Sequence, residues 1–117
     1  MESVGGEINA YTTKEDTWIT SSQRSKDTER AMELLADIAF QSVFPKAEMD
    51  KERDVILDEI AGVQDQPGDV IFESFEAGLY QGHPLAAPIL GAAESVKRLS
   101  RKQVQDFVSR HYRPDNM

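Results

Sequence analysis

The chain has 117 residues and a formal net charge of −8, from 13 lysines and arginines against 21 aspartates and glutamates. This length suits one domain and is too short for two of ordinary size. An acidic chain repels phosphate backbones, so nucleic-acid binding would need a local basic patch. The basic residues that gather near the C-terminus are typical of a solvated helix face, and we exclude DNA and RNA as partners. They are Lys97, Arg98, Arg101, Lys102 and Arg110.

Two classes of sequence signal are absent. The chain contains no cysteine, which excludes disulfides, thiolate zinc sites and cysteine nucleophiles and leaves the redox compartment undetermined. No apolar stretch approaches the roughly 20 residues that cross a bilayer, and residues 1–6 resemble no signal peptide. We therefore expect no membrane partner. The location stays unknown from these signals, and the cytoplasm is the location that we favour.

Extended segments open the chain. Gly5-Gly6 is a turn signal, and residues 8–13 offer β-favouring residues with polar alternates. After a break at residues 14–16, residues 17–22 form a second β-branched run. These segments predict a β-hairpin, which is marginal alone and needs a third strand or a covering helix.

Helical patterns fill the rest of the chain. After Asp27, a plausible N-cap, one helical face carries Ala31, Leu34, Leu35, Ile38 and Ala39. Pro45 suits the first turn of a helix that runs to about residue 63, and residues 64–68 end it. Residues 69–80 and 93–99 form further helices around an irregular stretch. Ser100 and Gln103 form a capping box for a last helix, which Arg113-Pro114 stops.

This order of elements indicates the α+β class. A hairpin followed by about four or five helices packed on one side, with no return strand, resembles a sheet that lacks some of its strands. We therefore expect that the chain pairs its strands with another chain or is an excerpt from a larger domain. Because one modest core must stabilise a chain of this length, most of its apolar residues are expected to be buried.

Two carboxylates interrupt the apolar stripe of the helix over residues 46–63. At 100° per residue the stripe spans about 140° and contains Met49, Glu52, Val55, Ile56, Glu59, Ile60 and Val63. Glu52 and Glu59 lie two turns, or about 10 Å, apart along the axis. A desolvated carboxylate needs a partner, which could be Arg24, Arg53, a lysine or a bound cation. Partial exposure of the stripe is the plainer alternative to a binding or catalytic role.

Other candidates for chemistry are weaker. A lone histidine such as His83 or His111 is more often a hydrogen-bonded anchor than a metal ligand. Gly5-Gly6 and Gly82 lack the spacing that cradles phosphates. The hydroxyls, Ser21 and Ser22 among them, have no histidine and acid nearby in the sequence to suggest a triad.

Several separated motifs point to one family. Residues 5–17 match the pattern GGxxNAxTxxExT and residues 52–60 match ERxVIxxEI. Asp65-x-Pro67, the stretch 83–91 and Tyr112-x-Pro114-x-Asn116-Met117 follow in order. Over residues 5–117 the chain thus resembles the pitrilysin/insulinase family of zinc metallopeptidases, which includes the mitochondrial processing peptidase.

The resemblance implies roles for particular residues. In the family, an inverted HxxEH motif supplies two zinc ligands and the glutamate that activates water, and a later glutamate is the third ligand. This places the third zinc ligand at Glu59 and a supporting glutamate at Glu52. It also implies that a peptide or protein substrate adds as a strand beside Asn9, Ala10 and Tyr11.

The chain also departs from the family, because HxxEH occurs nowhere in its sequence. We therefore expect a single partial metallopeptidase domain, residues 1–117, truncated at both ends. The parent would be a zinc endopeptidase, and the chain alone would be inactive without tightly bound zinc. The alternatives are a non-catalytic partner subunit and an acidic peptide-binding module of the same fold. Expected partners are the rest of the parent chain, a homologous domain, or a second copy that pairs at exposed strand edges.

Overall fold

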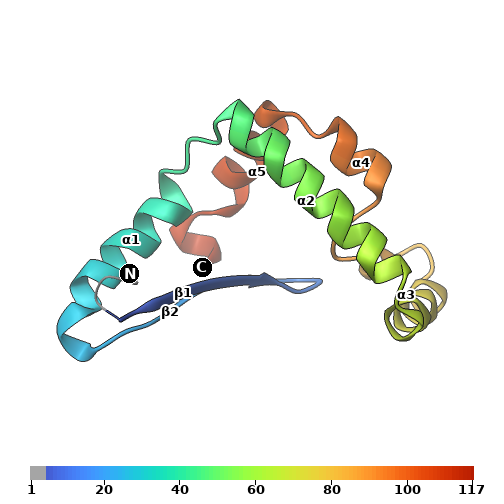
Figure 1. The fold of residues 1–117 in the computed structure, drawn as a ribbon, viewed down its shortest axis with the longest axis horizontal. Coiled ribbons are helices and arrows are strands. Elements are labelled where there is room, and N and C mark those ends of the chain that lie inside the picture. Colours follow the sequence, from blue (N-terminus) through green and yellow to red (C-terminus); the bar gives the residue numbers. More distant parts are fainter. Residues whose placement is uncertain (1–4) are drawn as a thin grey trace. The chain divides into compact units, whose positions relative to one another are not determined.

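The computed structural model describes residues 5–117 and divides the chain into two compact units (Figure 1). The first unit comprises Met1–Val43 with Gln105–Met117, and the second comprises Phe44–Val104. Within the described residues, no helix is both long enough and apolar enough to span a bilayer. Each unit is described by itself below.

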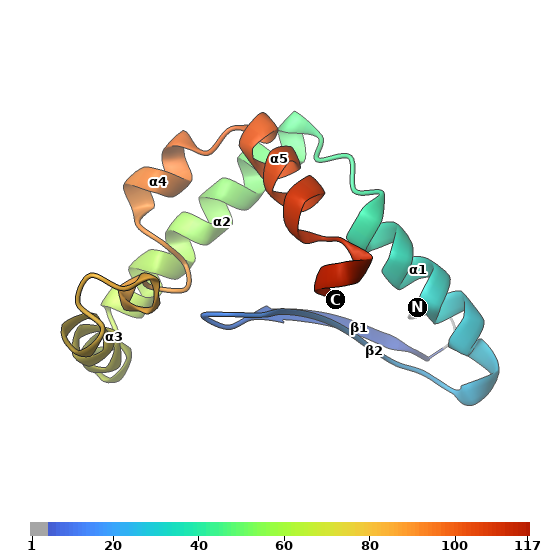
Figure 2. The same cartoon turned by 180° about the vertical axis from the view of Figure 1, so that it is seen from behind.

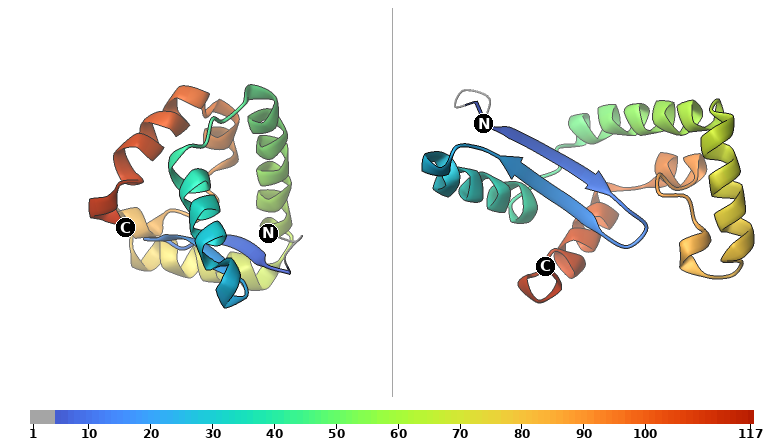
Figure 3. Two further views of the ribbon diagram at one scale, coloured as in Figure 1. Left: turned by 90° about the vertical axis from the view of Figure 1, so that its left-hand side faces the viewer. Right: turned by 90° about the horizontal axis from the view of Figure 1, so that it is seen from below.

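The first unit begins with the expected hairpin. Strands β1 (Glu7–Thr12) and β2 (Thr17–Ser22) pair antiparallel, with Ala10 opposite Ile19 and Tyr11 opposite Trp18 (Figure 3, right). The turn is closed by the Thr13 amide, which donates to the Asp16 carbonyl at 2.7 Å. The prediction of a hairpin is confirmed, with the first strand shifted by one residue toward the N-terminus.

Helix α1 (Thr28–Phe40) follows a 3-10 turn, η2 (Ser25–Asp27), and contacts β2. Its predicted apolar face is correct for Ala31 and Ala39, which are buried, and for Leu34 and Leu35, which are half-buried. The prediction is wrong for Ile38, which is 39% exposed. Asp27 stands at the N-cap position but does not cap the helix. Its carboxylate instead accepts a hydrogen bond from Arg24 at 3.2 Å.

The second unit is built from helices α2 (Lys46–Gln64), α3 (Pro67–Leu79) and α4 (Ala93–Arg98), with a 3-10 turn, η3 (Pro84–Ala86), between the last two. Helix α4 lies beside α2 (Figures 1 and 2). The predicted bounds of α2 and α4 hold to within one residue. The predicted start of α3 at residue 69 is wrong, because Pro67 has no amide hydrogen to leave unpaired and suits the first helical position.

Helix α5 (Arg101–His111) begins in the second unit and continues into the first. Its predicted capping box is confirmed: the Ser100 amide donates to Gln103 Oε1 at 2.9 Å, and the Gln103 amide donates to Ser100 Oγ at 3.3 Å. These reciprocal bonds satisfy two backbone donors at the start of the helix. After Arg113 the chain ends in a 3-10 turn, η4 (Pro114–Asn116).

Few apolar side chains are buried. Among the described residues, the buried apolar ones are Ala31, Ala39 and Ile60. The expectation that most apolar residues enter one core is therefore wrong. Helix α3 shows the reason, because its apolar stripe faces outward: Phe72 is 71% and Phe75 is 65% exposed. The elements of the second unit cover only one side of each helix.

This arrangement predicts unequal effects of truncating apolar residues. Ile60→Ala should lower the free energy of unfolding by about 2–4 kcal/mol, since it leaves a cavity beneath α2. Phe72→Ala should change it by no more than about 0.5 kcal/mol, because the ring is already solvated. Urea unfolding followed by far-UV circular dichroism would measure both. Equal losses in the two variants would contradict the burial pattern.

Candidate functional site

Helix α2 has a single packing face, and its position differs from the predicted stripe. The residues that are buried or half-buried along this helix are Met49, Asp50, Arg53, Ile56, Leu57, Ile60 and Val63. At 100° per residue their centre lies near Arg53 and Ile60, about 70° around the helix from the centre of the predicted stripe. Val55, which was expected to be inside, is 48% exposed.

Glu52 and Glu59 consequently lie beside the packing face and not within it. Both side chains are exposed to solvent. Within the described part of the chain neither carboxylate forms an ion pair or a hydrogen bond. Of the alternatives left open by the sequence, partial exposure describes these residues. Arg53 pairs with Asp50 instead, and Arg24 pairs with Asp27 in its own unit. The two carboxylates are free to accept a ligand.

Arg53 is engaged elsewhere. Its Nη1 donates to Asp50 Oδ1 at 2.7 Å, its Nε to the Val96 carbonyl at 3.3 Å, and its Nη2 to the Leu99 carbonyl at 3.0 Å. The side chain is 23% exposed, so most of its stem is covered. Sequence analysis considered Arg53 only as a partner for the glutamates. Its position could have indicated this role, because Arg53 lies four residues after Met49 and seven before Ile60 and therefore on the same side of the helix.

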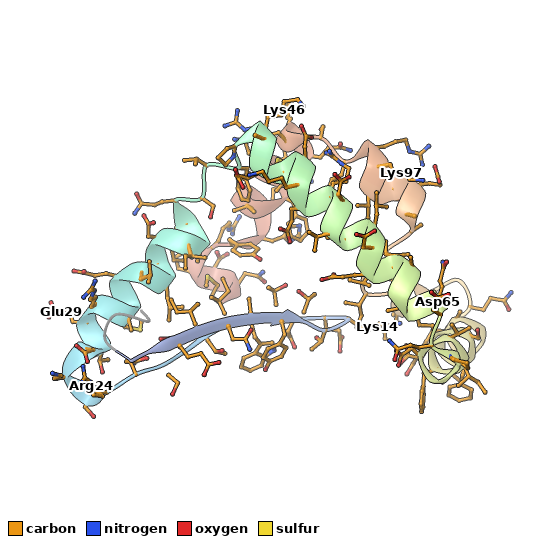
Figure 4. The ribbon with its side chains drawn as sticks, viewed as in Figure 1. Lys14, Arg24, Glu29, Lys46, Asp65 and Lys97 are labelled. Atoms are coloured by element: carbon orange, nitrogen blue, oxygen red, sulfur yellow. The ribbon has the colours of Figure 1, made fainter. Side chains whose placement is uncertain are left out.

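Charges at the start of α2 lower one pKa. The Lys46 ammonium donates a hydrogen bond to the Asp50 carboxylate, and the Arg53 guanidinium donates another. These bonds, that from Lys46 first, hold the pKa of Asp50 below its ordinary value. Figure 4 shows Lys46 at the beginning of α2 and Asp65 just past its end. Asp50 lies on α2 nine residues before Glu59, or about 13 Å along the helix axis, so the two carboxylates are well separated.

The proposed substrate strand is exposed. Asn9, Ala10 and Tyr11 lie in β1, and all are accessible to solvent. In the described sheet β1 pairs with β2 alone, so its other edge has no strand beside it. The Ala10 amide donates to the Asn9 side-chain oxygen at 2.9 Å, and the Tyr11 ring stacks on Trp18 with 5.9 Å between centroids. The three residues belong to the first unit, and the two glutamates belong to the second.

The first unit also contains an open groove of about 660 Å³. Its lining comes from β2, α1 and α5 and includes Trp18, Met32, Leu35, Phe40, Phe107 and His111. The His111 ring lies 4.5 Å from that of Phe107. His83, in the other unit, accepts a hydrogen bond from the Leu85 amide at 3.2 Å. The groove is mainly apolar, and His83 acts as the loop anchor that the sequence suggested.

The donor set for a metal is incomplete. Residues 5–117 contain no group of three or more histidine, cysteine, aspartate or glutamate side chains arranged to hold a metal ion. Zinc in proteins usually needs four ligands, of which at least three are protein side chains. The described residues therefore offer no complete ligand set, and Glu59 is the exposed carboxylate that the motif predicts as one ligand.

Comparisons with known proteins agree with the motifs. The family model described as Insulinase (Peptidase family M16) matches residues 1–93. A protein of Rickettsia felis named as an uncharacterized zinc protease is 38% identical over the whole chain, which covers 28% of that protein. Cytochrome b-c1 complex subunit 1 of Mus musculus is 40% identical over the whole chain, which covers 24% of it.

A solved structure supports the fold. The crystal structure of an M16-like peptidase from Alicyclobacillus acidocaldarius superposes with a TM-score of 0.83 and 25% sequence identity. The match covers 98% of this chain and 27% of the other. The chain thus spans about a quarter of the length of the relatives that it matches.

The hydrogen bonds around Asp50 predict a pH dependence. Because its pKa is lowered in the folded chain, its stabilising effect is present above its ordinary pKa and is lost as the pH falls through the lowered folded value. Lys46→Ala should raise the pKa of Asp50 more than Arg53→Ala does, since the Lys46 bond is the larger cause. A carboxyl carbon NMR titration would measure this. An Asp50 pKa that stays unchanged in Lys46→Ala would contradict it.

Proposed function

The chain belongs to the insulinase family of peptidases, and from this premise we propose that it is the segment of a zinc-dependent endopeptidase that supplies one zinc ligand and a substrate-binding strand. The observation that carries the proposal is identity of 38% over the whole chain to a relative named as a zinc protease. The exposed, unpaired Glu59 on α2 is consistent with it.

Glu59 is the proposed metal ligand. Its carboxylate is solvated and has no competing partner among the described residues, so ligation would not require breaking an existing bond. A zinc ion bound there would supply an activated water and polarise the substrate carbonyl. Glu52, two turns earlier on the same side of α2, would support the site through hydrogen bonds to a ligand or to substrate.

Hydrolysis needs residues that this chain does not contain. The sequence has no HxxEH motif, so the two histidine ligands and the general base are missing from these 117 residues. The chain alone is therefore proposed to be inactive and to bind zinc weakly. Its activity would depend on the rest of a parent chain or on a homologous domain.

The β1 edge is the proposed site of substrate binding. A peptide in extended conformation could hydrogen-bond along Asn9, Ala10 and Tyr11 as an added strand. Backbone hydrogen bonds depend little on side-chain identity, so such a strand accepts varied sequences. The Ala10 amide already bonds to the Asn9 side chain, which would move if the peptide used that donor.

A second function has its own support. The relative named cytochrome b-c1 complex subunit 1 is 40% identical, and its name describes a subunit of an assembly. A non-catalytic partner subunit, or an acidic peptide-binding module, would keep the β1 edge without using Glu59. The source gene distinguishes the two functions. An HxxEH motif encoded before this segment favours the peptidase, and its absence favours the partner subunit.

Zinc content tests the peptidase proposal. In the source protein, Glu59→Gln should weaken zinc binding by at least about 100-fold and abolish peptidase activity, because removal of a ligand exceeds the effect of removing a group that only supports it. Asp58→Asn is the matched control, since Asp58 is a neighbouring exposed carboxylate on α2. Metal analysis after dialysis and a peptide-cleavage assay would measure both variants.

Two results would overturn this assignment. One is zinc-dependent cleavage by the pure 117-residue chain, which would show a complete site where we expect one ligand. The other is a source protein in which Glu59→Gln and Asp58→Asn retain zinc equally well. The second result would favour the partner subunit.

The unpaired strand edge also predicts self-association. The 117-residue chain should dimerise in a concentration-dependent way, since an uncovered strand edge pairs with another chain. Ala10→Lys should weaken dimerisation, and Gln81→Lys, an exposed change in the other unit, should not. Sedimentation velocity over a wide concentration range would measure it. A strictly monomeric wild-type chain would contradict the prediction.

A further inference from the structure

Arg53 links α2 to the C-terminal end of α4. Its guanidinium bonds to the carbonyls of Val96 and Leu99, which are 43 and 46 residues away in the sequence. A third bond holds it to Asp50, one turn earlier on its own helix. One planar group is thus fixed by three acceptors that come from two separate segments.

The chemistry suits the end of a helix. The last carbonyls of a helix have no intrahelical partner and carry partial negative charge. Helix α4 has only six residues and continues into extended backbone at Leu99. A guanidinium donates several hydrogen bonds in a rigid fork, whereas a lysine ammonium is a single mobile donor group. Arg53 therefore gives the Leu99 carbonyl a partner, and it adds a second donor to the Val96 carbonyl, which also accepts from the Leu99 amide at 3.2 Å.

The hydrogen bonds of Arg53 also restrict the rotation of α2 about its axis. Arg53 lies near the centre of the packing face, and Glu52 and Glu59 lie about 100–120° from it around the helix axis. A helix held at Arg53 cannot turn about its axis without breaking those bonds. The direction in which both glutamates point is therefore tied to the Arg53 bonds.

We propose that Arg53 is a positioning residue that fixes the rotation of α2 and so aims Glu52 and Glu59. This inference rests on the proposed function where it concerns zinc, and on the geometry alone where it concerns the rotation. Arg53 does not touch the metal or the substrate in this proposal. It acts through the helix that carries the ligand.

Spin labels can measure the rotation directly. The chain has no cysteine, so nitroxides can be attached at Glu59→Cys and at Ser95→Cys, an exposed position on α4. Electron paramagnetic resonance then gives the distance distribution between two positions within one unit. We expect a single narrow distribution that broadens and shifts in Arg53→Ala. Arg53→Lys should restore part of it, since an ammonium can reach one carbonyl.

The control removes another charge from the same helix. Lys51 forms an ion pair with Glu48 at 2.9 Å, on the exposed side of α2. Lys51→Ala should leave the distance distribution unchanged. Helix content in each variant, measured by circular dichroism, separates rotation from unfolding. An unchanged distribution in Arg53→Ala, or an equal change in Lys51→Ala, would overturn the inference.

Zinc affinity in the source protein tests whether Arg53 affects the proposed zinc ligand Glu59. Arg53→Ala should weaken zinc binding by about 10–100-fold, the usual effect of losing a group that orients a ligand, and Arg53→Lys should recover part of it. If the labels report rotation and Glu59→Gln leaves zinc unaffected, the proposed function fails while the anchor stands. If Glu59→Gln loses zinc and Arg53→Ala does not, the positioning role fails while the proposed function stands.

Discussion

The packing of α2 depends on how the guanidinium of Arg53 is bound within the second unit. The Arg53 side chain is mostly covered, and its head bonds to carbonyls at the C-terminal end of α4. Ile60, the buried residue of this helix, lies two turns farther along nearly the same line. Together they define which side of α2 faces the unit, and this choice places Glu52 and Glu59 at its margin.

The charge distribution adds to this picture. Residues 54–96 contain eight acidic residues and no lysine or arginine, so the net charge of −8 arises entirely in this stretch. Arg53 immediately precedes it and bonds to Val96 at its end. Like charges along such a stretch repel one another and attract cations. The position of Glu59 within it favours the approach of a divalent metal and disfavours anionic ligands.

Local signals in the sequence were sufficient for most of the elements. The hairpin, the helices and the capping box at Ser100 follow from periodicity and turn residues, which act over a few positions. The rotation of α2 about its axis did not follow from such signals. The helical projection used hydrophobicity alone, so it placed the apolar Val55 inside and the polar Arg53 outside. What decides between them is the pair of carbonyls at Val96 and Leu99, which are distant in sequence. The solvent exposure of the apolar residues on α3 was not predicted for a related reason. Periodicity identifies an apolar stripe but does not show which element covers it.

The roles of the substrate strand and the two glutamates had another source. Asn9, Ala10 and Tyr11 were singled out by a motif alone. The helical projection drew attention to Glu59, and the motif gave it the role of a zinc ligand. Their geometry is consistent with those roles because β1 has an open edge and Glu59 has no partner. A ligand site formed by several segments can be recognised only in part from one segment.

Exposed ion pairs contribute little to the stability of this segment. Ion pairs such as Lys51–Glu48 are exposed and contribute at most about 1 kcal/mol each. The outward stripe of α3 consists of Ile71, Phe72, Phe75 and Leu79. Covering these four side chains would contribute about 1.5–3 kcal/mol for each one. A protein surface that packs on α3 would therefore stabilise the second unit more than its exposed ion pairs do.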